Sequence, residues 1–159
     1  MRNSLGTVEA VRTFFVPPKR KHVLNEVLES FEDNHIRSLK LITQTRWMER
    51  LHGVQRFKEL YNIIILALEK IQDFDKRDTS REAMALLATI TKGEFVVCMV
   101  MLSEIFAFGE PICRQFQRHD LDLGELVKIA GDLKRELANM QENAHDYFKR
   151  LFLVAQELA

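Results

Sequence analysis

Apolar residues recur at helical spacing along most of the chain. In residues 18–32 they fall at positions i, i+3, i+4 and i+7, which places them on one face of an α-helix: Leu24, Val27, Leu28 and Phe31. A shorter stripe predicts a first helix over residues 4–16, and Pro17-Pro18 ends it. The sequence has no alternating run bounded by Asn-Gly or Asp-Gly turns, so it signals no β-hairpin. The pattern therefore predicts an all-α chain.

The middle of the chain carries a longer stripe. It begins at Thr45 and keeps spacings of three and four for roughly seven turns. This predicts one long helix or two nearly continuous ones, with the bend at Gly53. The apolar run at residues 62–66 would suit a strand, but helical spacing continues on both sides, so we expect it to be helical. After a charged connection, Thr79 and Glu82 predict a capping box that opens the next helix.

The last third of the chain predicts two further long helices. Residues 95–108 are apolar on nearly every face, which predicts the central helix of the core. Residues 109–111, Gly-Glu-Pro, are expected to kink or restart it. Asp122 and Glu125 form a second predicted capping box. It opens an amphipathic helix that we expect to run as far as Val154, with a length of about 50 Å.

These elements add up to roughly six helices in one bundle-like domain. The expected domain spans residues 1–159. Leading helices occupy residues 1–38, the helix with an Arg-Trp step residues 39–75, and the central and C-terminal long helices residues 76–159.

Composition narrows the class of protein. Of the 159 residues 47% are apolar and 29% charged, and Lys plus Arg equal Asp plus Glu at 23 each. Zero net charge argues against a general polyanion-binding module. The two cysteines, Cys98 and Cys113, form no disulfide framework and suit a reducing compartment. The longest apolar run, residues 95–102, is too short to span a membrane. We expect an intracellular protein with no membrane contact.

Motifs for catalysis are missing from the sequence. None of the five histidines has the spacing of a metal-binding pair, and glycine-rich phosphate loops are absent. No serine lies in a nucleophile elbow. The carboxylates suit solvated helix faces, as in the Asp132–Arg135 pair. We therefore expect no catalytic residue, metal, cofactor or small-molecule substrate.

Two segments are candidates for contact with nucleic acid. The first is Thr45-Arg46-Trp47, which contains the only tryptophan. Trp47 begins the apolar stripe, so it is expected to be half buried with Arg46 facing solvent. Alternatively, the step offers a cation and a flat ring to a nucleic acid. Both interpretations stay open.

The second candidate is the basic run Lys19-Arg20-Lys21, at the start of a predicted helix. A solvated first turn explains it most simply, and we favour that interpretation. The alternative is a phosphate contact or a nuclear import patch.

These residues resemble segments of hAT-superfamily transposases and their domesticated relatives, the zinc-finger MYM-type proteins. Residues 43–47, Thr-Gln-Thr-Arg-Trp, resemble the family's Cys-Glu-Thr-Arg-Trp, without its leading Cys-Glu. Residues 111–117, followed by Asp-Leu at 120–121, are similar to the family's Pro-Leu-Ser-Arg-x-Leu-Gln and the Asp-Leu after it. Phe-Phe at residues 14–15, followed by Lys-Arg at 19–20, is similar to a third family step.

The resemblance implies a place within a larger architecture. Family transposases have an RNase H-like domain with an Asp-Asp-Glu metal site, interrupted by a large helical insertion. This chain resembles that insertion, so the first two catalytic aspartates would lie before Met1 and the glutamate after Ala159. In the family the tryptophan lies near the transposon end and helps to stabilise a flipped base, a role implied here for Trp47.

The expected function follows from that resemblance. We expect a non-catalytic fragment of a domesticated transposase that acts in the nucleus as a helical scaffold. Its expected partners are DNA, another protein or further copies of the chain. The alternative is the insertion part of an active DNA transposase whose catalytic Asp and Glu residues lie outside this chain.

Overall fold

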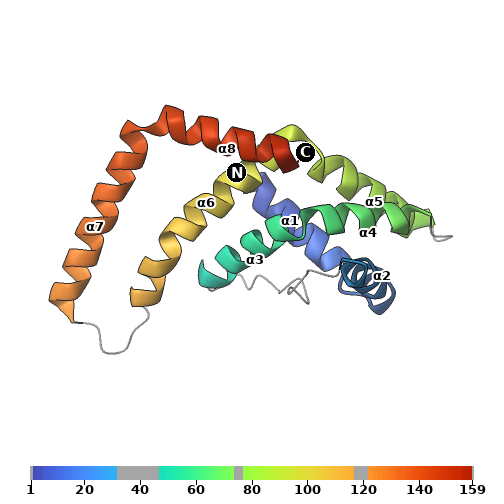
Figure 1. The fold of residues 1–159 in the computed structure, drawn as a ribbon. Coiled ribbons are helices and arrows are strands. Elements are labelled where there is room, and N and C mark those ends of the chain that lie inside the picture. Colours follow the sequence, from blue (N-terminus) through green and yellow to red (C-terminus); the bar gives the residue numbers. More distant parts are fainter. Residues whose placement is uncertain (1, 32–46, 74–76, 117–121, 159) are drawn as a thin grey trace.

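The described part of the protein is entirely helical. The computed structural model describes residues 2–31, 47–73, 77–116 and 122–158, and these ranges contain no strand (Figure 1). The side chains of residues 2–3, 47–51, 108, 111–113, 116 and 123 are outside this description. Eight helices are present there, where the spacing predicted roughly six: α1 (Arg2–Phe14), α2 (Pro18–Glu29), α3 (Trp47–Glu59), α4 (Tyr61–Gln72), α5 (Arg77–Ile90), α6 (Gly93–Phe116), α7 (Leu123–Glu142) and α8 (Ala144–Leu158).

One extra helix comes from a break at Leu60. The bend predicted at Gly53 is wrong, because Gly53 lies inside α3. Leu60 leaves the helical conformation, with φ −95° and ψ 8°, and its side chain is fully buried. Beyond it α4 packs on α2 and α5, whereas α3 packs on α6. The turn at Leu60 therefore lets two halves of one apolar stripe bury against different partners.

A second break divides the predicted 50 Å C-terminal helix into α7 and α8. Asn143 has φ −101° and ψ 24°, and its Nδ2 donates to the Asn139 carbonyl at 2.9 Å and to Asn139 Oδ1 at 2.8 Å. An asparagine side chain that bonds to the preceding turn competes with the helical backbone pattern. Leu151 and Ala155 of α8 are buried, and α8 packs on α6. The prediction of one straight helix is therefore wrong.

The two predicted capping boxes have different outcomes. Asp122 is the N-cap of α7, and its Oδ1 accepts hydrogen bonds from the amides of Gly124 and, at 3.0 Å, Glu125. The box at Thr79 is wrong, because α5 already begins at Arg77. Ser80 in that first turn instead donates its hydroxyl to the Gln72 carbonyl at 2.6 Å, which joins α5 to the end of α4.

The predicted restart at residues 109–111 is wrong, because α6 runs without a break to Phe116; the alternative, a kink within the helix, stays a prediction. Phe106 just before this segment is buried, and Glu110 within it contacts His52 of α3 at 3.2 Å. Contacts with the neighbouring helix thus hold the segment helical against the local preference of glycine and proline.

The core lies around α6, α3 and α4. Phe95, Val96, Met99 and Val100 of α6 are buried, as predicted for the central helix. The Phe95 ring meets that of Phe57 on α3 edge to face, with 5.9 Å between their centroids. α1 crosses behind α3 and α4 (Figure 1). α4 supplies Tyr61, whose hydroxyl donates to the Ile90 carbonyl of α5 at 3.0 Å.

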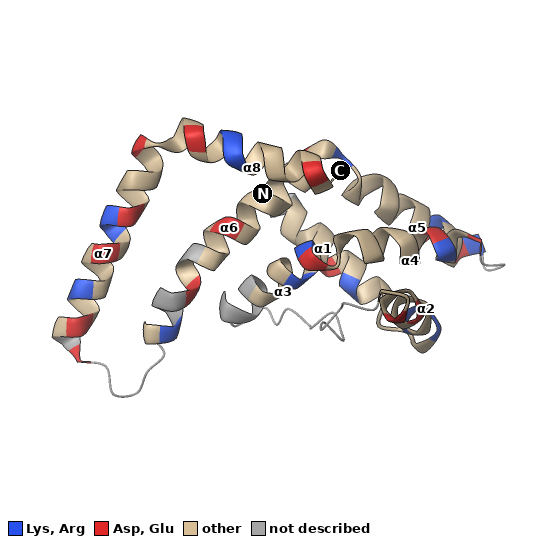
Figure 2. Cartoon of the chain, in the orientation of Figure 1, with Lys and Arg blue, Asp and Glu red and all other residues tan. Residues whose placement is uncertain are grey.

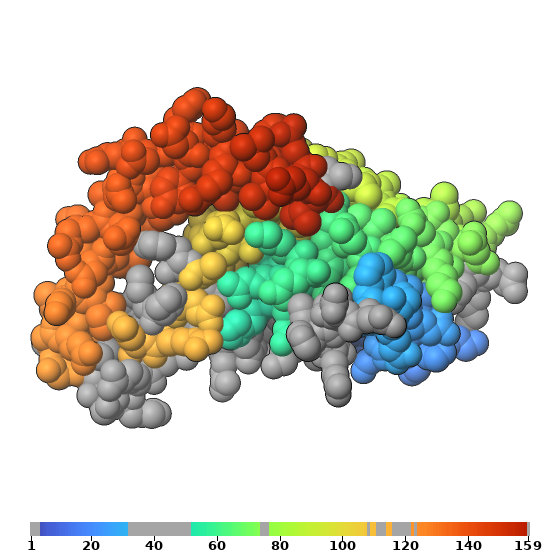
Figure 3. Space-filling view, in the orientation of Figure 1, coloured from blue at the N-terminus to red at the C-terminus, as the bar shows by residue number. Residues whose placement is uncertain are grey.

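α7 is separate from this core. None of its described side chains is buried. It forms an arm at one side of the molecule, joined to α8 above and to the C-terminal end of α6 below (Figure 1). The space-filling view shows openings between this arm and the rest of the protein (Figure 3).

Candidate functional site

The Arg-Trp step lies at the boundary of the described residues. Trp47 is the first described residue of α3. Thr45 and Arg46 lie outside the described residues, and so does the Trp47 side chain. The two interpretations of the triplet therefore both stay open.

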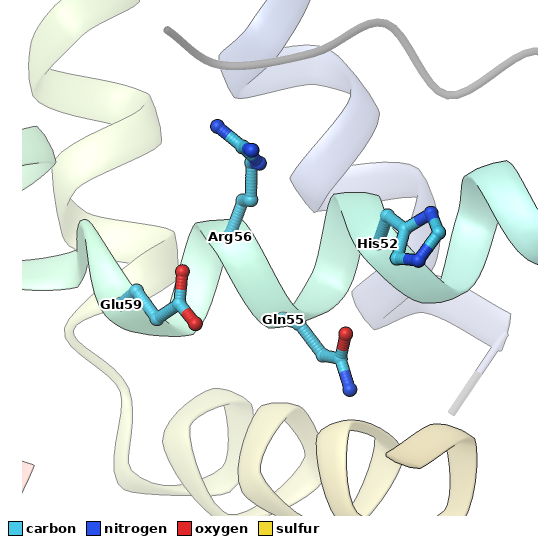
Figure 4. Close-up of a pocket in the computed structure, with 4 residues that line it drawn as sticks. All are labelled: His52, Gln55, Arg56 and Glu59. Atoms are coloured by element: carbon cyan, nitrogen blue, oxygen red, sulfur yellow. The ribbon is translucent and has the colours of Figure 1, made fainter. Parts of the chain in front are cut away.

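Downstream of Trp47, α3 carries a polar face. His52, Gln55, Arg56 and Glu59 recur at helical spacing and line a hollow of about 270 Å³ (Figure 4). Arg56 extends above the helix in this view, Gln55 extends below it, and Glu59 lies in front of it. The described lining combines a cation, a carboxylate, an imidazole and an amide, which can form hydrogen bonds, and it holds no pair of carboxylates of the kind used in acid–base catalysis among these described residues.

Polar contacts join α3 to α6 beside this hollow. His52 Nε2 lies 3.2 Å from Glu110 Oε1, and Arg114 Nη2 donates to the same oxygen at 2.5 Å. Lys58 Nζ lies 3.4 Å from Glu104 Oε1, nearly two turns along the same pair of helices. The hydrogen bond with His52, and then the bond and charge of Arg114, lower the pKa of the Glu110 carboxyl, although desolvation opposes the shift. Glu110 is therefore held as a carboxylate between two helices.

The sequence carries no local signal of this contact. Residue 110 lies in the segment predicted to kink or restart the helix, and none of the histidines has the spacing of a metal-binding pair. The two positions are 58 residues apart, and no local spacing signals their proximity.

The three residues of the basic run at the start of α2 have different surroundings. The Arg20 guanidinium lies 4.4 Å from the centre of the Phe14 ring and 3.1 Å from Glu82 Oε2 on α5. Lys19 and Lys21 are exposed. Arg20 thus ties α2 to α1 and α5, and the two lysines provide the solvated part of the run.

Acidic groups accompany the basic run. Glu26 lies 3.2 Å from His22 and 2.6 Å from Lys70 of α4. The Lys70 ammonium lowers the pKa of the Glu26 carboxyl, first through the hydrogen bond and then through its charge. Blue and red positions are mixed at this end of the molecule (Figure 2). The described surface here is therefore of mixed sign.

An aromatic pair is exposed on α8. Phe148 and Phe152 are stacked with 6.2 Å between ring centroids, and 50% and 42% of their surfaces remain in water. They lie beside the buried face of α8 that holds Leu151 and Ala155. The amphipathic helix predicted for this part of the chain gave no indication that these two rings are exposed.

The described ranges hold neither a cluster of metal ligands nor a single helix suited to span a membrane. No three or more His, Cys, Asp or Glu side chains come together there as metal ligands would. No single helix has both the length and the apolar composition of a membrane span; Arg77–Ile90 and Gly93–Ala107 meet these criteria only jointly, with a bend of 70° between them.

Comparison with known proteins adds no relative. No protein-family model, no curated protein and no solved structure matches this chain.

Proposed function

We propose that this chain is a non-catalytic helical scaffold that binds a protein partner through α8. The observation that carries the proposal is the stacked and exposed pair Phe148 and Phe152. Aromatic side chains are enriched at the centres of protein interfaces, where they bury large areas at a low entropic cost. Leu153, which is also exposed, extends the apolar character of this helix.

The origin of the scaffold is part of the same proposal. The resemblance of residues 43–47 and 111–117 to hAT-superfamily segments supports descent from a transposase insertion. A domesticated fragment of this kind would act in the nucleus and would keep helical surfaces for assembly without supplying catalytic carboxylates.

The α8 surface can be tested by replacing both phenylalanines with serine. In cells that express the tagged full chain, we expect Phe148→Ser with Phe152→Ser to reduce recovery of a bound partner about tenfold. The melting temperature should stay close to that of the wild type, because both rings are exposed. Val127→Ser on α7 removes another exposed apolar side chain and should leave recovery unchanged. Equal recovery of every partner by all three proteins would refute the proposal.

A second candidate function rests on the resemblance of residues 43–47 to the family's Cys-Glu-Thr-Arg-Trp segment. An Arg-Trp step offers a cation and a flat ring to a nucleic acid. In this interpretation the chain is the insertion part of an active DNA transposase with its catalytic residues outside the chain. Thr45, Arg46 and Trp47 would then contact DNA, and exposed Lys19 and Lys21 would bind its phosphates.

Paired measurements of stability and DNA affinity distinguish the two functions. If Trp47 is a core residue, Trp47→Ala should lower the free energy of unfolding by about 3 kcal/mol. If it contacts DNA, the variant should stay folded and lose affinity for a transposon-end hairpin. Arg46→Ala should then weaken binding without changing the melting temperature, and the affinity should fall with salt.

Strand cleavage provides the test for an enzyme. We expect no cleavage of a labelled hairpin DNA with Mg²⁺ or Mn²⁺. Cleavage that disappears when an acidic residue of this chain is replaced would contradict the scaffold proposal.

A further inference from the structure

The apolar stripe of α7 consists of five side chains that are incompletely buried. They recur at intervals of three and four: Leu126, Ile129, Leu133, Leu137 and Met140. Four of them are partly buried, and Leu137 is 48% exposed. A hollow of about 420 Å³ lies on one side of the stripe, where Leu133 and Leu137 line it together with Ala130, Lys134, Ala138 and Gln141. The part of the stripe that remains in water is unfavourable, and an amphipathic helix normally covers such a stripe fully with another element.

Charges on the two sides of this stripe have opposite signs. With about 100° between successive residues, Asp132 and Lys134 lie on opposite sides of Leu133. Glu125 and Glu136 lie on the same side as Asp132, and these three residues form the acidic flank. Lys134, with Gln141, forms the basic flank, and it is the charged residue in the lining of the hollow. Figure 2 shows the red and blue positions along α7.

The charges on the two flanks become complementary when two copies of α7 pair in one of the two possible orientations. In a parallel pair of α7 helices, the twofold axis runs along the helices and the acidic flank of each copy faces the basic flank of the other. In an antiparallel pair the axis is perpendicular to the helices, so each flank faces the equivalent flank of the other molecule. Asp132 would then approach a second Asp132, which is unfavourable. Charge complementarity thus favours the parallel pair.

We propose that a second copy of this chain covers the apolar stripe, through a parallel α7–α7 contact in which Asp132 and Glu136 face Lys134 of the other copy. Twenty residues make a helix about 30 Å long, so the contact is short and the dimer should be weak. The proposal goes beyond the scaffold function, because α7 and the aromatic pair of α8 are different surfaces.

Charge exchange tests the contact in the full chain. We expect sedimentation equilibrium to show a concentration-dependent dimer. Lys134→Asp alone or Asp132→Lys alone should weaken dimerisation about tenfold, because each places like charges face to face at two symmetric positions. The double variant Asp132→Lys with Lys134→Asp should restore it, because the flanks become complementary again.

Two controls separate the contact from effects on the helix. Lys128→Asp makes the same charge change about 140° around the helix from Leu133, behind the acidic flank and away from the contact, and should leave the dimer unchanged. Asp132 also accepts a hydrogen bond from Arg135, so Arg135→Ala measures the loss of that bond alone and should also leave the dimer unchanged. Helix content of each variant is checked by circular dichroism.

Cysteine cross-linking tests the orientation. Met140→Cys should form an oxidised dimer with itself, because a parallel pair brings equivalent residues together; the parent chain shows the background from Cys98 and Cys113. Cross-linking that appears only on mixing Leu126→Cys with Met140→Cys protein would indicate an antiparallel pair and overturn the proposal.

A monomer at every concentration, or a double variant that fails to recover, would also overturn it. Neither outcome affects the α8 proposal, since the α8 variants leave α7 intact.

Discussion

Arg12 of α1 has a buried guanidinium that pairs with Glu9. Its side chain is 2% exposed and Nη1 donates to Glu9 Oε2 at 2.8 Å, whereas Nε has no hydrogen-bond partner among the residues that the structure describes. Desolvation lowers the pKa of Arg12, and the charge and hydrogen bond of Glu9 oppose that shift. The cation therefore depends on Glu9, which is itself partly in water.

The Arg12–Glu9 pair yields a stability prediction. Glu9→Gln should lower the free energy of unfolding by about 1–2 kcal/mol, because it leaves a buried cation with a neutral partner. Adding Arg12→Met should recover at least part of this loss, since an apolar side chain fits the buried position. Urea denaturation of the single and double variants measures both values. A double variant less stable than Glu9→Gln alone would show that the guanidinium stabilises the fold through contacts other than Glu9.

Glu110 yields a prediction about pH. Its pKa is lowered from the ordinary value of 4.5, chiefly by the hydrogen bond with His52. The unfolded chain therefore binds this proton more readily than the folded chain. The contribution of Glu110 should be fully present above pH 4.5 and should be lost as the pH falls through the lowered folded pKa.

Stability curves from pH 6 to pH 2 test this prediction for Glu110. The difference between wild type and Glu110→Gln should shrink as the pH falls towards the acid end of that range. A difference that stays constant would mean that the carboxylate does not stabilise the fold.

At the scale of elements, the sequence predicts what depends on local spacing. The stripes at residues 4–16 and 18–32 correspond to α1 and α2 within a few residues, and the Asp122 cap is confirmed. The breaks at Leu60 and Asn143 were missed, because each depends on which distant helix the next segment packs against. Proximity of His52 to Glu110 was unpredictable for the same reason.

Two glycine substitutions test whether the helices unfold together. Gly6 in α1 and Gly131 in α7 both have free space where a Cβ would lie. Gly6→Ala should raise the global free energy of unfolding by about 1 kcal/mol, through better helix propensity in an element that belongs to the core. Gly131→Ala should slow hydrogen exchange within α7 and leave the global value nearly unchanged. Equal global increases would show that α7 unfolds cooperatively with the body.

The whole molecule combines a packed body with an exposed arm. Because α7 buries none of its described side chains, its backbone hydrogen bonds should open without unfolding of the core. At low protein concentration, we expect α7 amides to exchange much faster than those of α4 and of residues 95–106 in α6. Hydrogen exchange with peptide-level mass spectrometry measures this, and uniform protection across the three segments would contradict it.

Because α8 packs on α6, the core of a chain that is still being translated can be completed only after α8 has been made. The face of α6 that α8 covers is translated first, then all of α7, and only afterwards Leu151 and Ala155. A nascent chain must therefore keep an apolar face of α6 in water while the ribosome makes the arm. Slow codons within α7 would lengthen the time for which this face of α6 is exposed. Slow codons within α8 would not delay the folding of α1 to α5. Translation of α7 therefore separates in time the synthesis of the central helix α6 from its burial by α8.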